Sequence, residues 1–112
     1  MKLSRKIAWY AVVAAAAGVL AFPAISFADD ASAALFKTKC AGCHGADAKG
    51  ETTMGKTFKL RDLASADVQK QSDADLTTIL TAGKNKMPAY GKSLSADQIK
   101  GLVGYVRSLA KK

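Results

Sequence analysis

The sequence predicts an all-α fold. Two segments, Ser72 to Gly83 and Ser95 to the C-terminus, begin at a serine suited to a helix N-cap and carry apolar residues at helical spacing. No window alternates apolar and polar residues with a period of two between hairpin turns, so a β-sheet has no support. No internal repeat or interdomain linker follows Ala28, and we expect one compact domain.

The first 28 residues have the features of an export signal. Lys2, Arg5 and Lys6 form a basic start, and an apolar run follows over residues 7–22. The run ends in Ser26-Phe27-Ala28, a small-residue site of the kind that a signal peptidase cuts. We therefore expect cleavage in this segment and export of the domain that follows.

Cleavage after Ala28 would leave a domain of residues 29–112 in the periplasm, or in an equivalent compartment outside the cytoplasmic membrane. A retained anchor helix is the alternative, because an apolar run over residues 7–22 is near the short end of what crosses a bilayer. The remaining domain is small for an unaided apolar core. We expect a cofactor to help hold it.

The chain is basic. Of its 17 Lys and Arg residues three lie in the leader, so 14 stand against 9 Asp and Glu in the domain. This excess predicts either an acidic partner surface or simply good solubility. Export and the scattered placement of the lysines argue against nucleic acid as the partner.

The domain is predicted to begin with a helix from Asp30 to about Cys43. Its acidic start suits a helix N-terminus. Phe36, Cys40 and Cys43 stand at positions i, i+4 and i+7, which is one helical face. Both sulfurs should therefore face inward with Phe36.

The next stretch, from Gly45 to Gln71, is predicted to be a wrapping loop with one short helix near residues 65–71. Glycines interrupt a polar run here, and the helical period is lost. The glycines are Gly45, Gly50 and Gly55, and the apolar anchors are Phe58, Leu60 and Leu63.

Two amphipathic helices complete the domain. The first has the S-x-x-D capping form over Ser72–Asp75 and closes at Gly83. The second has S-x-x-Q over Ser95–Gln98 and keeps a helical period to the C-terminus. The apolar positions are Leu76, Ile79 and Leu80 in the first helix and Ile99, Leu102, Val103, Val106 and Leu109 in the second.

Both cysteines and the only histidine stand together in Cys40-Ala41-Gly42-Cys43-His44. Thiol–disulfide exchange would place such a pair after a strand in a βαβ unit, whereas a short predicted helix precedes it here. Zinc normally takes four protein ligands, and the segment supplies three. C-x-x-C-H is instead the attachment motif of haem c, because thiols one turn apart reach the two vinyl groups on one porphyrin edge.

We therefore predict one covalently bound haem c, with thioethers at Cys40 and Cys43 and with His44 as the proximal iron ligand. A low-spin haem for electron transfer needs a second axial ligand, and methionine suits a chain without another histidine. Met87 stands in an irregular, Pro-marked segment between two predicted helices. Met54 follows His44 so closely that it would have to double back sharply. We predict Met87 as the distal iron ligand.

These residues resemble the class I cytochromes c, specifically the small single-haem bacterial and cytochrome c6-like members. The resemblance covers nearly the whole domain through Cys40–His44, Met87-Pro88 and the C-terminal helix. It implies the cytochrome c fold, with three to four short helices around the haem. The N- and C-terminal helices should cross where Phe36 packs on Leu102 and Tyr105, with small residues at the crossing. These small residues are Ser32, Gly101 and Gly104.

The chain departs from its relatives in two places. Many relatives have a proline before the methionine whose carbonyl accepts the histidine Nδ1 hydrogen, but none occurs between His44 and Met87. Another carbonyl must then orient the ring. The tryptophan that contacts a haem propionate in mitochondrial relatives is also absent from the domain. Its expected substitutes are Arg61, Lys59 or Tyr90.

The resemblance implies an electron carrier rather than an enzyme, exported and soluble, that moves one electron between larger redox complexes. It implies no small-molecule substrate. Five lysines close in sequence to the predicted haem ligands should steer an acidic partner to the exposed haem edge. They are Lys39, Lys56, Lys84, Lys86 and Lys92.

Two other functions stay open. If the leader is retained, the chain would be a membrane-tethered cytochrome subunit of an oxidase or reductase. A five-coordinate haem would instead bind a small ligand or react with peroxide, and Met87-Pro88 argues against such an open site.

Overall fold

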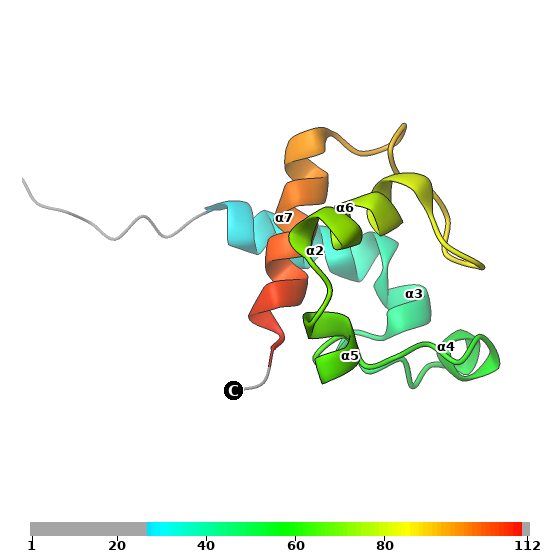
Figure 1. Ribbon diagram of the computed structural model, residues 1–112. Helices are drawn as coiled ribbons and strands as arrows, with labels where there is room; N and C mark the ends of the chain where they lie inside the picture. The colour runs from blue at the N-terminus through cyan, green and yellow to red at the C-terminus, as the bar shows by residue number, and fades with distance from the viewer. Residues whose placement is uncertain (1–26, 111–112) are drawn as a thin grey trace, which may run out of the picture.

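The computed structural model describes residues 27–110, so the predicted leader lies outside the described residues except for its last two. Residues 27–110 contain no strand, only an isolated bridge between Lys84 and Met87. The predicted all-α class is therefore confirmed (Figure 1). The helices are α2 (Phe27–Lys39), α3 (Ala41–His44), α4 (Thr53–Thr57), α5 (Ala66–Gln69), α6 (Asp73–Ala82) and α7 (Ala96–Ser108).

None of the helices within residues 27–110 is long and apolar enough to cross a membrane. The alternative of an anchor helix concerns residues 7–22, which lie outside this range.

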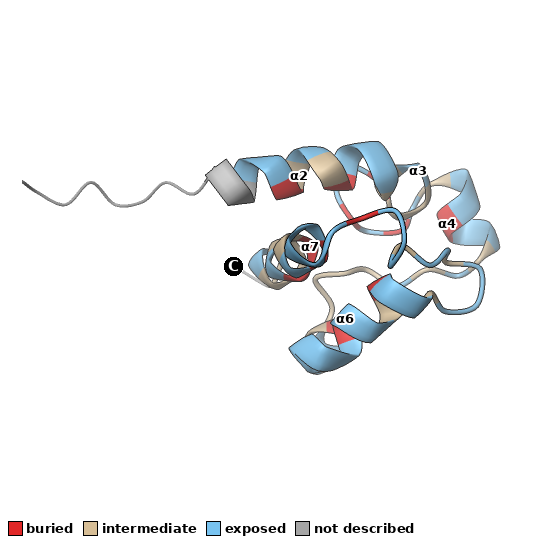
Figure 2. Cartoon of the chain, turned by 90° about the horizontal axis from the view of Figure 1, so that it is seen from above, coloured by how far each residue is buried: buried red, intermediate tan, exposed pale blue. Residues whose placement is uncertain are grey.

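Helices α2 and α7 cross at the centre of the domain, as predicted. Figure 2 shows α7 nearly end-on while α2 runs across the view. Phe36 of α2 and Leu102 of α7 are each only 2% exposed, and the Phe36 ring centroid lies 4.9 Å from that of Tyr105. The apolar core extends from this crossing to α5 and α6. Its buried residues are Phe36, Ala48, Val68, Leu76, Leu80, Leu94, Ile99, Leu102 and Val103.

The close approach of the two helices depends on Gly101. A Cβ at this position would overlap Oγ of the buried Ser32 on α2. A Cβ at Gly104 would meet no atom within 4 Å, and Gly104 is exposed. The expectation that Gly104 also serves the crossing is wrong, because this glycine lies on the solvent side of α7.

We expect Gly101→Ala to destabilise the haem-loaded protein by about 1–3 kcal/mol, because the added methyl group overpacks the crossing. Gly104→Ala is the matched control and should raise stability by up to about 1 kcal/mol through helix propensity alone. Thermal unfolding of the two variants beside the parent measures both effects. Equal melting temperatures for parent and Gly101→Ala would show that the helices can separate without cost.

Serine side chains cap three helices at their N-termini. Ser65, Ser72 and Ser95 each accept a hydrogen bond from the backbone N–H three residues later, and Ser95 forms a full capping box with Gln98. Each cap satisfies an N–H that the helix itself leaves without a partner. The predicted starts of α6 and α7, the end of α6 at Gly83 and the short helix near residues 65–71 are thereby confirmed.

Arg107 of α7 forms hydrogen bonds with the segment that joins α5 to α6. The sequence did not predict these contacts. The Arg107 Nε donates to Asp73 Oδ1 at 2.8 Å, and one terminal nitrogen donates to the Gln69 carbonyl at 2.7 Å. The other terminal nitrogen donates to the Gln71 carbonyl. The first terminal nitrogen also donates to Gln69 Oε1 at 3.4 Å, so the planar guanidinium binds four acceptors around one turn of chain and holds α6 against α7.

Two parts of the predicted helix pattern are wrong. The single helix expected from Asp30 to Cys43 is broken at Cys40, where α2 ends and the carbonyl of Cys40 accepts N–H groups from Cys43 and His44 to begin α3. The wrapping loop also contains a helix, α4, capped by Thr52.

Candidate functional site

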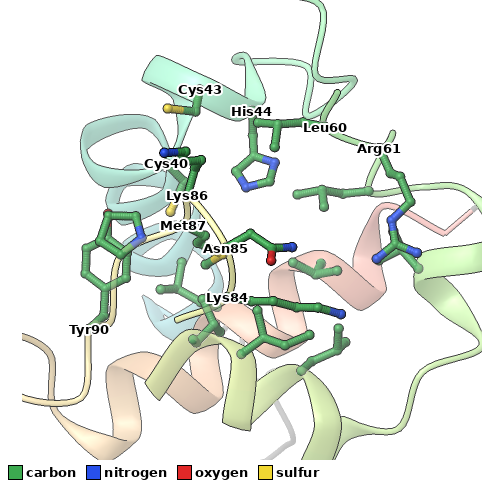
Figure 3. A pocket seen from close by; sticks show the side chains of 18 of the residues that line it. Cys40, Cys43, His44, Leu60, Arg61, Lys84, Asn85, Lys86, Met87 and Tyr90 are labelled. Carbon is green, nitrogen blue, oxygen red and sulfur yellow. The ribbon is translucent and has the colours of Figure 1, made fainter. Parts of the chain in front are cut away.

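The helices enclose a cavity of about 650 Å³ (Figure 3). Its lining comes from α2, α3, α5, α6 and α7, and from the loops around residues 58–63 and 84–90. Most of the lining is apolar and includes core side chains such as Phe36 and Leu102. The volume falls in the range of about 300–1,000 Å³ that is typical of cofactor sites.

All four side chains that the sequence predicts to bind haem line this cavity. Cys40 lies between α2 and α3, and Cys43 and His44 lie in α3. Met87 lies in the loop between α6 and α7. Met54, the rejected alternative, does not line the cavity and is 44% exposed on α4. The fold therefore brings together residues that are 43 positions apart, His44 and Met87.

The two cysteines are free thiols and are half-buried. Burial, and then the neighbouring Cys43, raise the pKa of the Cys40 thiol above its ordinary value. A disulfide oxidoreductase needs the opposite, a thiolate stabilised by a low pKa. The raised pKa of Cys40 therefore does not fit a thiol-exchange nucleophile.

His44 is placed with its ring at the cavity wall. Burial lowers the pKa of the imidazole below its ordinary value, which favours the neutral form that ligates metals. Its Nδ1 is buried, and no described residue accepts a hydrogen bond from it. The sequence predicted that a carbonyl other than that of a proline accepts the His44 Nδ1 hydrogen. No such carbonyl is found within residues 27–110.

The segment after His44 folds back beneath the attachment motif. Thr52 Oγ1 donates to the Cys43 carbonyl at 2.5 Å and accepts from the Gly55 N–H at 2.8 Å, and Gly50 N–H donates to the His44 carbonyl at 2.7 Å. A Cβ at Gly55 would overlap the carbonyls of Gly50 and Cys43. Helix α4 and its cap Thr52 thus pack on the backbone of α3 at Cys43. The sequence did not predict this role.

Basic side chains surround part of the cavity. We call these five the basic rim: Lys39, Lys59, Arg61, Lys84 and Lys86. Of the five lysines expected near the haem edge, Lys39, Lys84 and Lys86 therefore line the cavity, whereas Lys56 and Lys92 do not.

The three residues expected to replace the missing tryptophan, Lys59, Arg61 and Tyr90, all line the cavity. Tyr90 is half-buried, and its hydroxyl donates to the Lys39 carbonyl at 3.3 Å. Burial, followed by the nearby Cys40 and Cys43, raises the pKa of the Tyr90 phenol. The phenol is therefore a hydrogen-bond donor at neutral pH.

A metal ion held by protein groups alone is not supported within residues 27–110. No three His, Cys, Asp or Glu side chains gather there closely enough to form such a site. A bound group must bring its own metal ligands, as a porphyrin does, if iron is to be held here.

Comparison with known proteins identifies relatives of this site. Residues 28–106 match the family described as cytochrome c oxidase, cbb3-type, subunit III. Cytochrome c6 of Microcystis aeruginosa is 36% identical over 80 residues, which cover 71% of this chain and 95% of that protein. Subunit FixP of the cbb3-type cytochrome c oxidase of Rhizobium meliloti (strain 1021) is 39% identical over 77 residues, which cover 67% of this chain and 25% of FixP.

A solved structure is similar as well. The c-type cytochrome KustC0563 superposes with a TM-score of 0.66 at 29% identity, and the match covers 71% of this chain and 98% of that one. Together with the C-x-x-C-H motif, these likenesses show that haem c, covalently bound, is the cofactor. The residues present fit it, because free thiols, a neutral imidazole and a thioether meet at one largely apolar cavity.

Proposed function

The chain belongs to the class I cytochromes c, and we propose that it is an exported, soluble carrier with a single haem that moves one electron at a time between larger redox proteins. Electron transfer is the function of the family, and the soluble, single-haem form is the proposal. The observation that carries it is the meeting of His44 and Met87 at one cavity with a basic rim. Such a site can hold iron in a closed coordination shell.

We assign each haem contact to a residue. Cys40 and Cys43 would hold the haem through thioethers to its two vinyl groups, bonds that a thiol can form by addition without an oxidant. His44 would be the proximal iron ligand and Met87 the distal one. The haem supplies a centre that takes up and returns one electron. The Met87 thioether favours the ferrous state, and the apolar lining excludes water.

The basic rim is proposed as the place where electrons enter and leave. Its charges lie around the cavity that holds the cofactor, and an acidic surface on a redox partner would be drawn to them. The attraction acts mainly on the rate of encounter and weakens with salt.

We expect the double variant Lys39→Gln with Lys84→Gln to be oxidised about two- to fivefold more slowly than the parent by the anion ferricyanide at low salt. Oxidation by the cation tris(phenanthroline)cobalt(III) should become faster, because repulsion at the same place falls. Stopped-flow kinetics of the reduced protein measures both rates. In each reaction the ferrous protein gives up one electron to the complex.

Lys49→Gln with Lys100→Gln is the matched control, because it removes the same total charge as the rim variant. Both lysines are exposed and lie outside the cavity lining. This control should change both rates by less than half as much as the rim variant. Equal effects of the two pairs on ferricyanide would show that only net charge matters, and the rim would then have no docking role.

A membrane-tethered subunit of an oxidase is the second candidate. It is favoured by the family match to subunit III of cbb3-type oxidases and by the FixP relative. The two candidates differ in whether residues 1–28 remain attached. We propose that they are removed after Ala28, which would place the domain of residues 29–112 free in the periplasm. The intact mass of the protein isolated from its host distinguishes the two.

A further inference from the structure

The loop that carries Met87 is fixed along one side by α6. Gly83, at φ +77°, ends this helix, and a Cβ there would lie 2.7 Å from the Met87 carbonyl oxygen and 2.9 Å from the Ala89 nitrogen. Farther along, the N–H of Tyr90 donates to the Leu80 carbonyl at 2.9 Å. The loop therefore packs its backbone directly on the C-terminal turn of α6.

The tip of the loop is a tight turn. Lys84 N–H donates to the Met87 carbonyl at 3.1 Å, and Met87 N–H donates to the Lys84 carbonyl at 2.9 Å. Asn85 between them has φ +55°, a conformation that asparagine tolerates better than most residues. The backbone of Met87 is thus set by its own turn and by α6.

The loop also lines the cavity together with the haem-attachment segment, and few hydrogen bonds link the two. Within residues 27–110 a single hydrogen bond joins residues 83–91 to residues 36–44: Tyr90 O–H donates to the Lys39 carbonyl at 3.3 Å. Lys39 is the last residue of α2 and directly precedes Cys40. Figure 3 shows Tyr90 on the same side of the cavity as Cys40.

We propose that Tyr90 is a positioning residue whose phenol keeps the Met87 loop closed over the haem-attachment segment. The proposal rests on Met87 being the distal ligand. Without the Tyr90 bond the loop would be held only by α6 and by its own turn, and Met87 would leave the iron more readily. An outside ligand then competes for the vacated position. The aromatic ring fills space in either case, so the positioning role belongs to the hydroxyl group.

Tyr90→Phe keeps the ring and removes the donor, and Tyr105→Phe is its matched control. Tyr105 is also half-buried, its ring packs on Phe36, and the structure gives its hydroxyl no hydrogen bond within residues 27–110. The probe is imidazole, added to the ferric holoprotein. Loss of the far-red charge-transfer band reports displacement of methionine.

We expect imidazole to bind Tyr90→Phe about 3- to 10-fold more tightly than the parent, because a net hydrogen bond no longer opposes opening. Tyr105→Phe should stay within about twofold of the parent. Amide hydrogen exchange at Met87 should become faster in Tyr90→Phe, while exchange in the core of α7 stays unchanged.

Equal imidazole affinities for Tyr90→Phe and the parent would overturn the proposal, and so would an equal gain in Tyr105→Phe. These outcomes leave the ligation itself intact. If the parent lacked the far-red band, or if Met87→Ala kept it, the assignment of Met87 would fail instead, and the positioning role of Tyr90 with it.

Discussion

Replacing both Cys40 and Cys43 with serine should yield a chain that does not reach the native packing. The cavity is walled by the core residues themselves, among them Phe36 and Leu102. Without haem, the apolar side chains that line this cavity of about 650 Å³ would lose their packing partner and be exposed to water. The walls must therefore collapse, and helix packing is lost.

Circular dichroism of the haem-free Cys40→Ser, Cys43→Ser protein measures this loss. Near-ultraviolet signals from the buried aromatic side chains should vanish, and heating should give no cooperative transition. The two single variants are the controls: each retains one possible thioether, and we expect them to keep haem and to melt cooperatively at a lower temperature than the parent. A sharp, native-like melt of the haem-free double variant would contradict the structural role of the cofactor.

Met87→Ala should abolish the far-red charge-transfer band of the ferric protein. The alanine side chain cannot reach the iron, so the distal coordination position becomes available to water or to added ligands. The reduced variant should then bind carbon monoxide at neutral pH, which the parent should not do. Absorption spectra before and after addition of carbon monoxide measure both changes.

Met54→Ala is the control for this experiment, since Met54 is 44% exposed on α4 and does not line the cavity. Its spectra should match those of the parent. The assignment of Met87 fails if its alanine variant keeps the band while Met54→Ala loses it. Binding of carbon monoxide to the unmutated protein would favour the alternative of an open, ligand-binding haem.

The sequence predicted those parts of the fold that depend on local chemistry. Ser72 and Ser95 cap their helices within a single turn, and the apolar period after each serine marks a buried face, so α6 and α7 could be located from the residues alone. The same holds for Cys40, Cys43 and His44, whose spacing encodes one attachment motif. Met87 was predicted as a ligand because its loop is irregular and contains a proline, and the structure places it at the cavity.

Features that depend on distant contacts could not be predicted. Helix α4 has a suitable cap in Thr52, but Gly55 inside it signals a break in any sequence-based reading. The glycine is required there because the backbone passes against Cys43 and Gly50. Arg107 is a similar case, since its acceptors are backbone and side-chain oxygens more than 30 positions away in the chain. Gly101 and Gly104 cannot be told apart from the sequence, and only the position of α2 shows that Gly101 alone lies at the helix crossing.

The crossing of the first and last helices has a consequence for the order in which this protein is made. The attachment motif lies early in the domain, whereas Leu102 and Val103, which form one wall of the cavity, belong to the last helix. Until that helix has been synthesised, the cavity has no wall on that side. The attachment motif is therefore complete in the growing chain before the cavity is, and a haem held by Cys40 and Cys43 would give the final helix a surface to pack on.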